Sequence, residues 1–172
     1  MKSGGGKAKG ASFERAVCKR LSLWLSDGQR SDLLWRSAMS GGRATVQANS
    51  GKINLTQSGD VSAVGRDAYE FCERTFIEIK HYRDLSIARG FVCLTGTLVN
   101  FWEVAQREAF RYGKVPLLIA RQNLYPTLAI TRVDAGIFSS DPIIELRLWS
   151  AHVYLFDNVT SVTSKSRLRR GS

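Results

Sequence analysis

The eight residues from Thr75 to Tyr82, TFIEIKHY, constrain the fold most, because they combine the pattern of a buried strand with two charged side chains. Aromatic and β-branched residues favour a strand, in which alternate side chains share a face. Glu78 and Lys80 then lie on one face, and the two isoleucines and His81 point to the other. Burying a charge without a partner is costly, so this pair needs a structural or functional reason.

A further charged residue stands where another strand is expected to begin. The segment SGDVSAV, residues 58–64, places Asp60 directly after a glycine. If this strand pairs with 75–82, the carboxylates of Asp60 and Glu78 approach each other and repel unless a cation joins them. Magnesium prefers such an oxygen site, and the Lys80 ammonium could orient a water or stabilise developing negative charge. The alternative is an ordinary ion pair on a solvated strand face, worth under about 1 kcal/mol.

Hydrophobic periodicity predicts the order of the remaining elements. Ser12 is placed to cap a first helix that Gly28 ends, and a second amphipathic helix runs from 98 to 112 before Gly113. The link 65–74 fits either a strand extension or a helical turn, and residues 43–57 read as a polar loop. The predicted strands cover residues 33–37, 60–64, 75–82, 115–120, 127–132, 143–149 and 152–156.

Length and composition favour a single domain with a full hydrophobic core, since the chain has 172 residues of which 44% are hydrophobic. We expect a cytoplasmic protein, because no apolar run approaches the roughly 20 residues of a membrane helix and no secretory signal is evident. The three cysteines, Cys18, Cys72 and Cys93, are widely spaced and predict reduced thiols rather than a disulfide framework.

The net charge of +10 is concentrated near the two ends of the sequence. Without these end residues the chain has 18 basic and 15 acidic residues, so the net charge of the rest of the sequence is small. Flexible basic arms of this kind suit a phosphate backbone, although they also serve solubility or bind any polyanion. The end residues concerned are Lys2, Lys7, Lys9, Lys165, Arg167, Arg169 and Arg170.

Four segments in order, GASFERAV, WRSAMSGG, SGDVSAV and FIEIKHY, resemble the PD-(D/E)XK nuclease superfamily, and within it the archaeal-type Holliday junction resolvases and related small phage and bacterial nucleases. The likeness covers roughly residues 10–121. It implies an α/β (α+β) fold with a restriction-endonuclease-like core of order αβββαβ and a mixed central sheet, followed here by a β-rich C-terminal extension. The expected divisions are a flexible basic arm at 1–11, a nuclease core at 12–133 with an insertion at 43–57, an extension at 134–160 and a basic tail at 161–172.

The resemblance also implies roles for individual residues. Asp60, Glu78 and Lys80 match the acidic, acidic and lysine positions of the signature, with the backbone carbonyl of Ile79 as a further metal ligand. Glu14 would supply the glutamate that the family carries near the metal on its first helix, although any carboxylate in a first helical turn is stabilised by the dipole. Gly59 stands where many members have a proline.

Several other residues are candidate DNA contacts, each with a plainer alternative. Ser40, Gly41, Gly42 and Arg43 could form a turn whose amides and guanidinium meet a phosphate, or simply a tight turn. Gln106 lies beside the apolar stripe of the second helix and is equally an ordinary surface glutamine. The remaining candidates are Arg36 and Arg83, which flank the site in sequence, with Lys7, Lys9, Lys165, Arg167, Arg169 and Arg170 on the arms.

The sequence therefore predicts a Mg²⁺-dependent deoxyribonuclease, with Mn²⁺ as a substitute and no small-molecule cofactor or membrane partner. The resemblance favours branched DNA as substrate, a homodimer that makes two symmetric cuts, and a role in DNA recombination or repair in bacterial or phage-infected cytoplasm. One alternative is a nuclease on linear duplex or single-stranded DNA in repair, restriction or phage DNA metabolism. The other is a non-catalytic nucleic-acid-binding protein in which the charged residues form only an ion-pair network.

Overall fold

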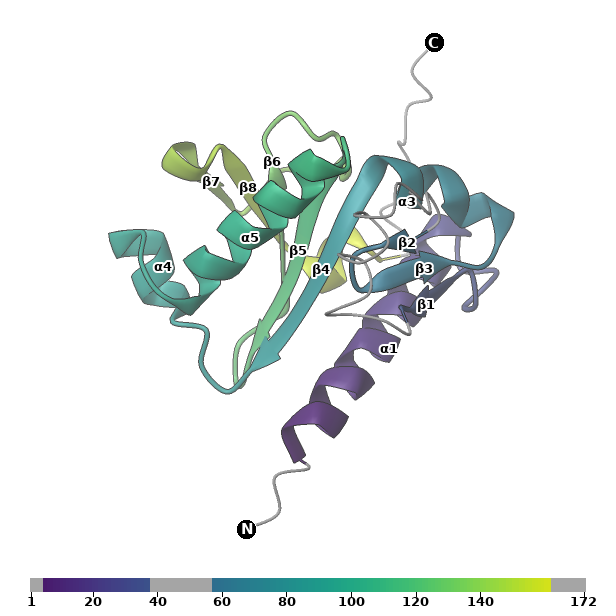
Figure 1. Cartoon of the computed structure of the whole chain (residues 1–172), viewed down its shortest axis with the longest axis horizontal. Coiled ribbons are helices and arrows are strands. Elements are labelled where there is room, and N and C mark those ends of the chain that lie inside the picture. The colour runs from purple at the N-terminus through teal and green to yellow at the C-terminus, as the bar shows by residue number, and fades with distance from the viewer. Residues whose placement is uncertain (1–4, 38–56, 162–172) are drawn as a thin grey trace.

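The chain folds around a five-stranded mixed sheet with helices on both faces and a three-stranded antiparallel sheet beside it (Figure 1). A computed structural model describes residues 5–37 and 57–161. The architecture is mixed α+β and compatible with a restriction-endonuclease-like core, as predicted. The helices are α1 (Gly5–Leu25), η1 (Arg66–Ala68), α3 (Tyr69–Arg74), α4 (Ile87–Cys93), α5 (Thr97–Arg111), η2 (Arg147–Trp149) and α6 (Phe156–Val159). The strands are β1 (Leu34–Arg36), β2 (Gln57–Ser58), β3 (Val61–Ala63), β4 (Thr75–Tyr82), β5 (Val115–Gln122), β6 (Leu128–Arg132), β7 (Ile144–Leu146) and β8 (Ala151–Leu155).

The large sheet has the strand order β4-β5-β6-β8-β7. The pair β4 and β5 is parallel, with Glu78 opposite Leu118 and Ile79 opposite Ile119. All other pairs in this sheet are antiparallel. A parallel pair needs a long crossover, which α4 and α5 provide. The predicted strand 75–82 is confirmed with its bounds unchanged.

Each face of the large sheet has its own hydrophobic core, because alternate strand residues point to opposite faces. Ile77, Ile79 and Ile119 pack with α1. Leu118, Ala120 and the other residues of the opposite face pack with α5. The sheet is thus covered on both sides, and Glu78 and Lys80 belong to the α5 side.

The small sheet has the order β1-β3-β2 and is joined to the large sheet at one point. There, Gly59 forms an isolated parallel bridge with Ile77. β1 also lies against α1 (Figure 1). The small sheet therefore places Asp60 at the edge of β4 that does not pair with β5.

The first helix starts earlier than the sequence predicted. α1 begins at Gly5, so Ser12 lies inside the helix rather than at its cap, and residues 5–11 are not the expected flexible arm. Alanine and lysine in this stretch favour a helix, which offsets the cost of the glycines. The Lys9 ammonium also donates to the Asn123 side chain at 2.7 Å and ties this turn to the end of β5.

The C-terminal strands continue the central sheet. β8 pairs with β6 and β7 pairs with β8, so the expected extension forms the far half of the same sheet. The predicted strand 143–149 is shortened to β7, since the chain turns into η2 at Arg147. The link 65–74 is helical, formed by η1 and α3. No helix in the described parts of the chain is long and apolar enough to cross a membrane.

Candidate active site

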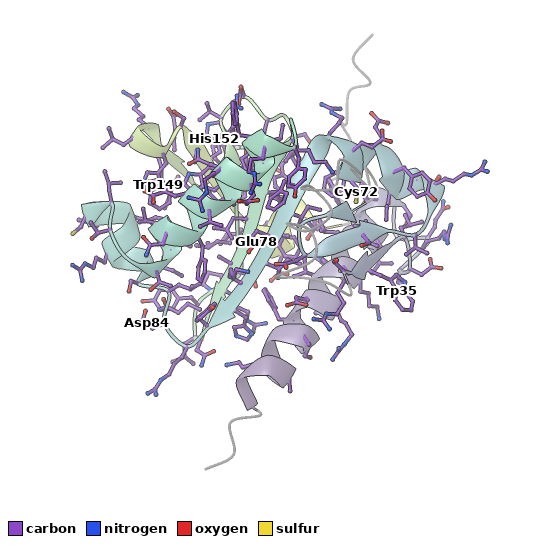
Figure 2. All side chains as sticks on the ribbon, viewed as in Figure 1. Trp35, Cys72, Glu78, Asp84, Trp149 and His152 are labelled. Carbon is purple, nitrogen blue, oxygen red and sulfur yellow. The ribbon has the colours of Figure 1, made fainter. Side chains whose placement is uncertain are left out.

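Glu78, labelled on β4 in Figure 2, forms the centre of the candidate site together with Lys80 on the same strand. The Lys80 ammonium donates to the Glu78 carboxylate and lies 3.6 Å from Oδ2 of Asp60. It also lies 5.6 Å from the centre of the Phe101 ring on α5, in a cation–π arrangement. All three charged side chains are largely buried, with 22% of Lys80, 16% of Glu78 and 8% of Asp60 exposed. The predicted meeting of the two strands' charges is therefore present.

Asp60 is held in place by hydrogen bonds to Ile77, Ser37 and Ile79. Its N–H donates to the Ile77 carbonyl at 2.9 Å, and its own carbonyl accepts from the Ser37 N–H at 2.8 Å. Its side-chain Oδ2 accepts from the Ile79 N–H at 2.8 Å. Because the N–H and C=O of one strand residue point to the same edge, the Ile79 carbonyl also faces the Asp60 side of β4. A carboxylate oxygen and a backbone carbonyl are thus available at this edge.

Gly59 permits this close approach of the small sheet to β4. Its φ is +65°, and a Cβ at this position would lie 2.3 Å from the Ile77 carbonyl oxygen. Proline fixes φ near −65°, so it cannot adopt this conformation. The glycine in place of the family's frequent proline is therefore required by the local backbone.

Glu14 on α1 lies near Asp60 and forms an ion pair with Arg36. Arg36 Nε donates to Glu14 Oε2 at 2.7 Å, and 16% of the Glu14 side chain is exposed. The neighbouring Ser37 N–H holds the backbone of Asp60, so the end of β1 supports both carboxylates. The Nε of Arg36 thus donates to the acidic group, and its contact with a phosphate stays a prediction.

Burial and mutual repulsion disfavour the ionised carboxylates. Burial, with the charge of Glu14, raises the pKa of Asp60 even though Lys80 and the Ile79 N–H oppose the shift. Burial and the charge of Asp60 raise the pKa of Glu78 in the same way. Burial disfavours the Lys80 cation, but Asp60 and Glu78 outweigh it, and the pKa of Lys80 is raised. Lys80 is therefore a cation at neutral pH.

This donor set fits a hard divalent cation, because an added positive charge would relieve the repulsion that raises both carboxylate pKa values. Asp60, Glu78 and the Ile79 carbonyl are the groups that could hold it. Within residues 5–37 and 57–161, no three or more His, Cys, Asp or Glu side chains converge as a metal site. Glu14 accordingly stays with Arg36, while the Lys80 ammonium lies between the two central carboxylates.

The other predicted DNA contacts lie away from this centre or outside the described part of the chain. Arg83 is exposed one residue beyond β4. Gln106 lines a different cavity, with Lys114 and Arg132. Lys9 is exposed on α1, bonded to Asn123. The positions outside the described backbone or side chains are Ser40, Gly41, Gly42, Arg43, Lys7, Lys165, Arg167, Arg169 and Arg170.

Glu108 on α5 is a residue near the site that the sequence reasoning missed. Its charge contributes to raising the pKa of Glu78, and it pairs with Arg111 at 3.2 Å. Glu108 follows Phe101 by seven residues, so both lie on one stripe of the helix. The sequence shows this spacing, but the approach of the stripe to Glu78 depends on how α5 lies over the sheet.

The fold and site together define a nuclease-type domain. A strand carries Glu-x-Lys, an aspartate from a neighbouring sheet lies beside that pair, and a glutamate lies on the first helix. A family model described as "Phage putative PDDEXK endonuclease" matches residues 5–161. The chain belongs to this family, and hence to the PD-(D/E)XK superfamily that its motifs resemble. No curated protein and no solved structure matched the chain.

Proposed function

We propose that this protein hydrolyses phosphodiester bonds of DNA with Mg²⁺ as its metal, at the site formed by Asp60, Glu78 and Lys80. One observation carries the proposal: two buried carboxylates with raised pKa values share one lysine ammonium at the edge of β4. Removing charges from water costs free energy, and solvated surface charges do not incur this cost. A cation site therefore explains the buried carboxylates better than a structural ion pair does. Mn²⁺ is expected to substitute, since it accepts the same oxygen ligands.

The chain's residues divide the chemistry between them. A bound divalent cation would polarise the scissile phosphate and lower the pKa of a water. Asp60, Glu78 and the Ile79 carbonyl would hold that cation. Lys80 stays protonated beside two carboxylates, so it acts as a hydrogen-bond donor and positive charge near the attacking water or the developing oxyanion, not as a base. Glu14, oriented by Arg36, adds negative charge next to Asp60.

Branched DNA is our proposed substrate class, supported by the resemblance of the four motifs to junction resolvases. Two symmetric cuts at a four-way junction require two sites, hence a homodimer. β7 lies at one edge of the large sheet and offers backbone groups for pairing between copies. We place this activity in DNA recombination or repair in the cytoplasm of a bacterium or a phage-infected host.

The test compares cleavage of an end-labelled four-way junction, a linear duplex and a single strand of matched sequence. Wild-type protein is expected to cut in Mg²⁺ or Mn²⁺ and not in EDTA, with the junction cut fastest. Asp60→Asn is expected to lose cleavage, whereas Asp84→Asn, at an exposed aspartate that accepts from the Ser86 N–H in its own turn, is the matched control.

Each alternative predicts a different outcome of that experiment. Equal or faster cutting of the linear or single-stranded substrates would replace branched DNA with those substrates. Binding of all three without any cleavage, in either metal, would favour the non-catalytic nucleic-acid-binding protein. Cleavage retained by Asp60→Asn would place the chemistry elsewhere.

A further inference from the structure

A cationic groove lies on a different flank of α1 from Glu14. It encloses a cavity of about 290 Å³ between α1, the end of β5 and the start of α6. Consecutive helix residues are about 100° apart, so Phe13 faces this groove while Glu14 faces Arg36. The lining residues are Phe13, Ala16, Val17, Arg20, Arg121, Tyr125, Pro126, Thr127, Phe156 and Asp157.

The charge of the groove is positive and partly fixed in place. Arg20 donates to the Thr160 hydroxyl at 3.1 Å and to the Asp157 carbonyl at 2.9 Å. The Arg121 guanidinium lies 5.8 Å from the centre of the Phe13 ring. Asp157 is the one acidic residue among those that line the groove.

Further cations lie along α1. Lys9 lies at the carboxyl ends of the parallel strands β4 and β5, where its ammonium meets Asn123. Arg15 and Lys19 are exposed on the same helix. The one acidic residue of α1, Glu14, is already neutralised by Arg36. The basic surface therefore continues from the flank of the active site across α1 to the groove.

The side chains in the groove suit a polyanion that carries flat apolar groups. Exposed Tyr125 is the kind of group on which nucleobases stack, and the surrounding cations, among them Arg121, match a backbone of phosphates. The carboxyl ends of parallel strands are also a common place for ligands in α/β sheets.

We propose that this groove is a second nucleic-acid contact surface, which binds the phosphodiester backbone of the substrate outside the cleavage site. The proposal rests on the endonuclease function proposed above. It assigns Lys9 and Arg121 to phosphates, and it places the bound flank of the DNA across α1. The flank is either duplex or single-stranded, and both present the same backbone chemistry.

The test measures how DNA affinity depends on salt when two charges of the groove are removed. Lys9→Gln/Arg121→Gln is made in an Asp60→Asn background, so that binding is measured without cleavage. Arg89→Gln/Arg147→Gln removes the same charge from α4 and η2, on the far side of the molecule (Figure 1), and is the matched control. A Lys9→Arg/Arg121→Lys variant keeps the charge and changes only shape.

The groove variant is expected to bind about tenfold more weakly at moderate salt, while the control and the charge-retaining variant bind like the parent. Its plot of log affinity against log salt should be shallower by about 1.8 for duplex and about 1.4 for single-stranded DNA, since each phosphate contributes about 0.9 and about 0.7. If affinity and slope change only with single-stranded DNA, and Tyr125→Ala also weakens binding of single-stranded DNA, the bound flank is single-stranded. If they change only with duplex DNA, the bound flank is duplex.

Three outcomes overturn the proposal. The groove variant could keep the slope of the control, the charge-retaining variant could lose affinity equally, or the parent could fail to bind DNA. Cleavage by the wild-type protein is measured separately, so an active nuclease with an unchanged slope refutes the groove alone. An inactive protein whose groove variant still shows the shallower slope refutes only the nuclease.

Discussion

Burial and the neighbouring charges shift the pKa of Lys80 in opposite directions, and the neighbouring charges have the larger effect. Burial alone would lower the pKa of the ammonium, but Asp60 and Glu78 raise it. A lysine held as a cation cannot serve as a general base at neutral pH. Its place between two carboxylates suits a positive charge that acts on the phosphate or the attacking water.

Removing this cation should reduce the rate of cleavage. Lys80→Met is expected to lower the single-turnover cleavage rate by about 10²–10³, the range for loss of one preorganised donor. Arg147→Met, at a side chain that is 89% exposed, should cut at the wild-type rate. A Lys80→Met protein with wild-type cleavage would remove the lysine from the chemistry.

Glu78 should destabilise the protein in the absence of metal, because the folded state disfavours its charge. Its folded-state pKa is raised, so stability is highest below the unfolded-state pKa and falls as pH rises through the folded-state pKa. Glu78→Gln keeps the shape and leaves Lys80 paired with Asp60. We expect it to raise the free energy of unfolding in EDTA by about 0.5–2 kcal/mol near neutral pH, as stabilising substitutions commonly do.

Denaturant unfolding in EDTA at several pH values checks this expectation. The gain from Glu78→Gln should vanish below about pH 4, where the carboxyl is protonated in both states. Glu70→Gln, at an exposed side chain, should change stability little at any pH. A Glu78→Gln protein less stable than wild type near neutral pH would show that the ion pair outweighs the desolvation.

At the scale of elements, the junction between β3 and β4 depends on Gly59. We expect Gly59→Ala to destabilise the fold by more than about 2 kcal/mol, since the new Cβ would meet the Ile77 carbonyl in addition to the strain of a positive φ. Gly113→Ala is the matched control, because Gly113 has φ +64° but open space around it, so only about 1–2 kcal/mol is expected. Thermal unfolding of the two variants measures the difference, and equal losses would refute a steric role for Gly59.

The elements that the sequence predicted well are those whose signal is local. β4 and α5 show clear periods bounded by polar residues or glycine, so their bounds were close or unchanged. The start of α1 was missed because its glycines disfavour a helix, and α4 was missed because it is short and has no capping side chain. β7 was predicted too long because the apolar run continues through Trp149, although the chain turns into η2 at Arg147.

The central pair of the site was predictable because alternation along one strand places Glu78 and Lys80 on one face. Their meeting with Asp60 depends on the bridge between Gly59 and Ile77, which joins the small sheet to β4 just before β3 begins. The ion pair of Glu14 with Arg36 was not predictable, since it depends on how α1 lies against β1. The approach of Glu108 depends likewise on the rotation of α5 over the sheet.

For the whole molecule, the C-terminal strands are part of the structural core. Val153 and Tyr154 on β8 are buried on opposite faces of the large sheet and complete its two cores. Deleting residues 134–172 would expose those cores and the edge of β6. We therefore expect the truncated protein to be unfolded or aggregated by circular dichroism and size-exclusion chromatography. A folded, monodisperse 1–133 fragment would instead support an autonomous nuclease core with an added extension.

The proposal of a metal-dependent nuclease site is tested most directly by the single-turnover cleavage of four-way-junction DNA as Mg²⁺ is increased, for wild type, Glu78→Gln and Asp84→Asn. We expect metal-dependent cleavage by wild type and Asp84→Asn, and a rate for Glu78→Gln that is lower by at least about 10² at every Mg²⁺ concentration. Cleavage by Glu78→Gln at the wild-type rate, or cleavage by wild type that persists in EDTA, would contradict it.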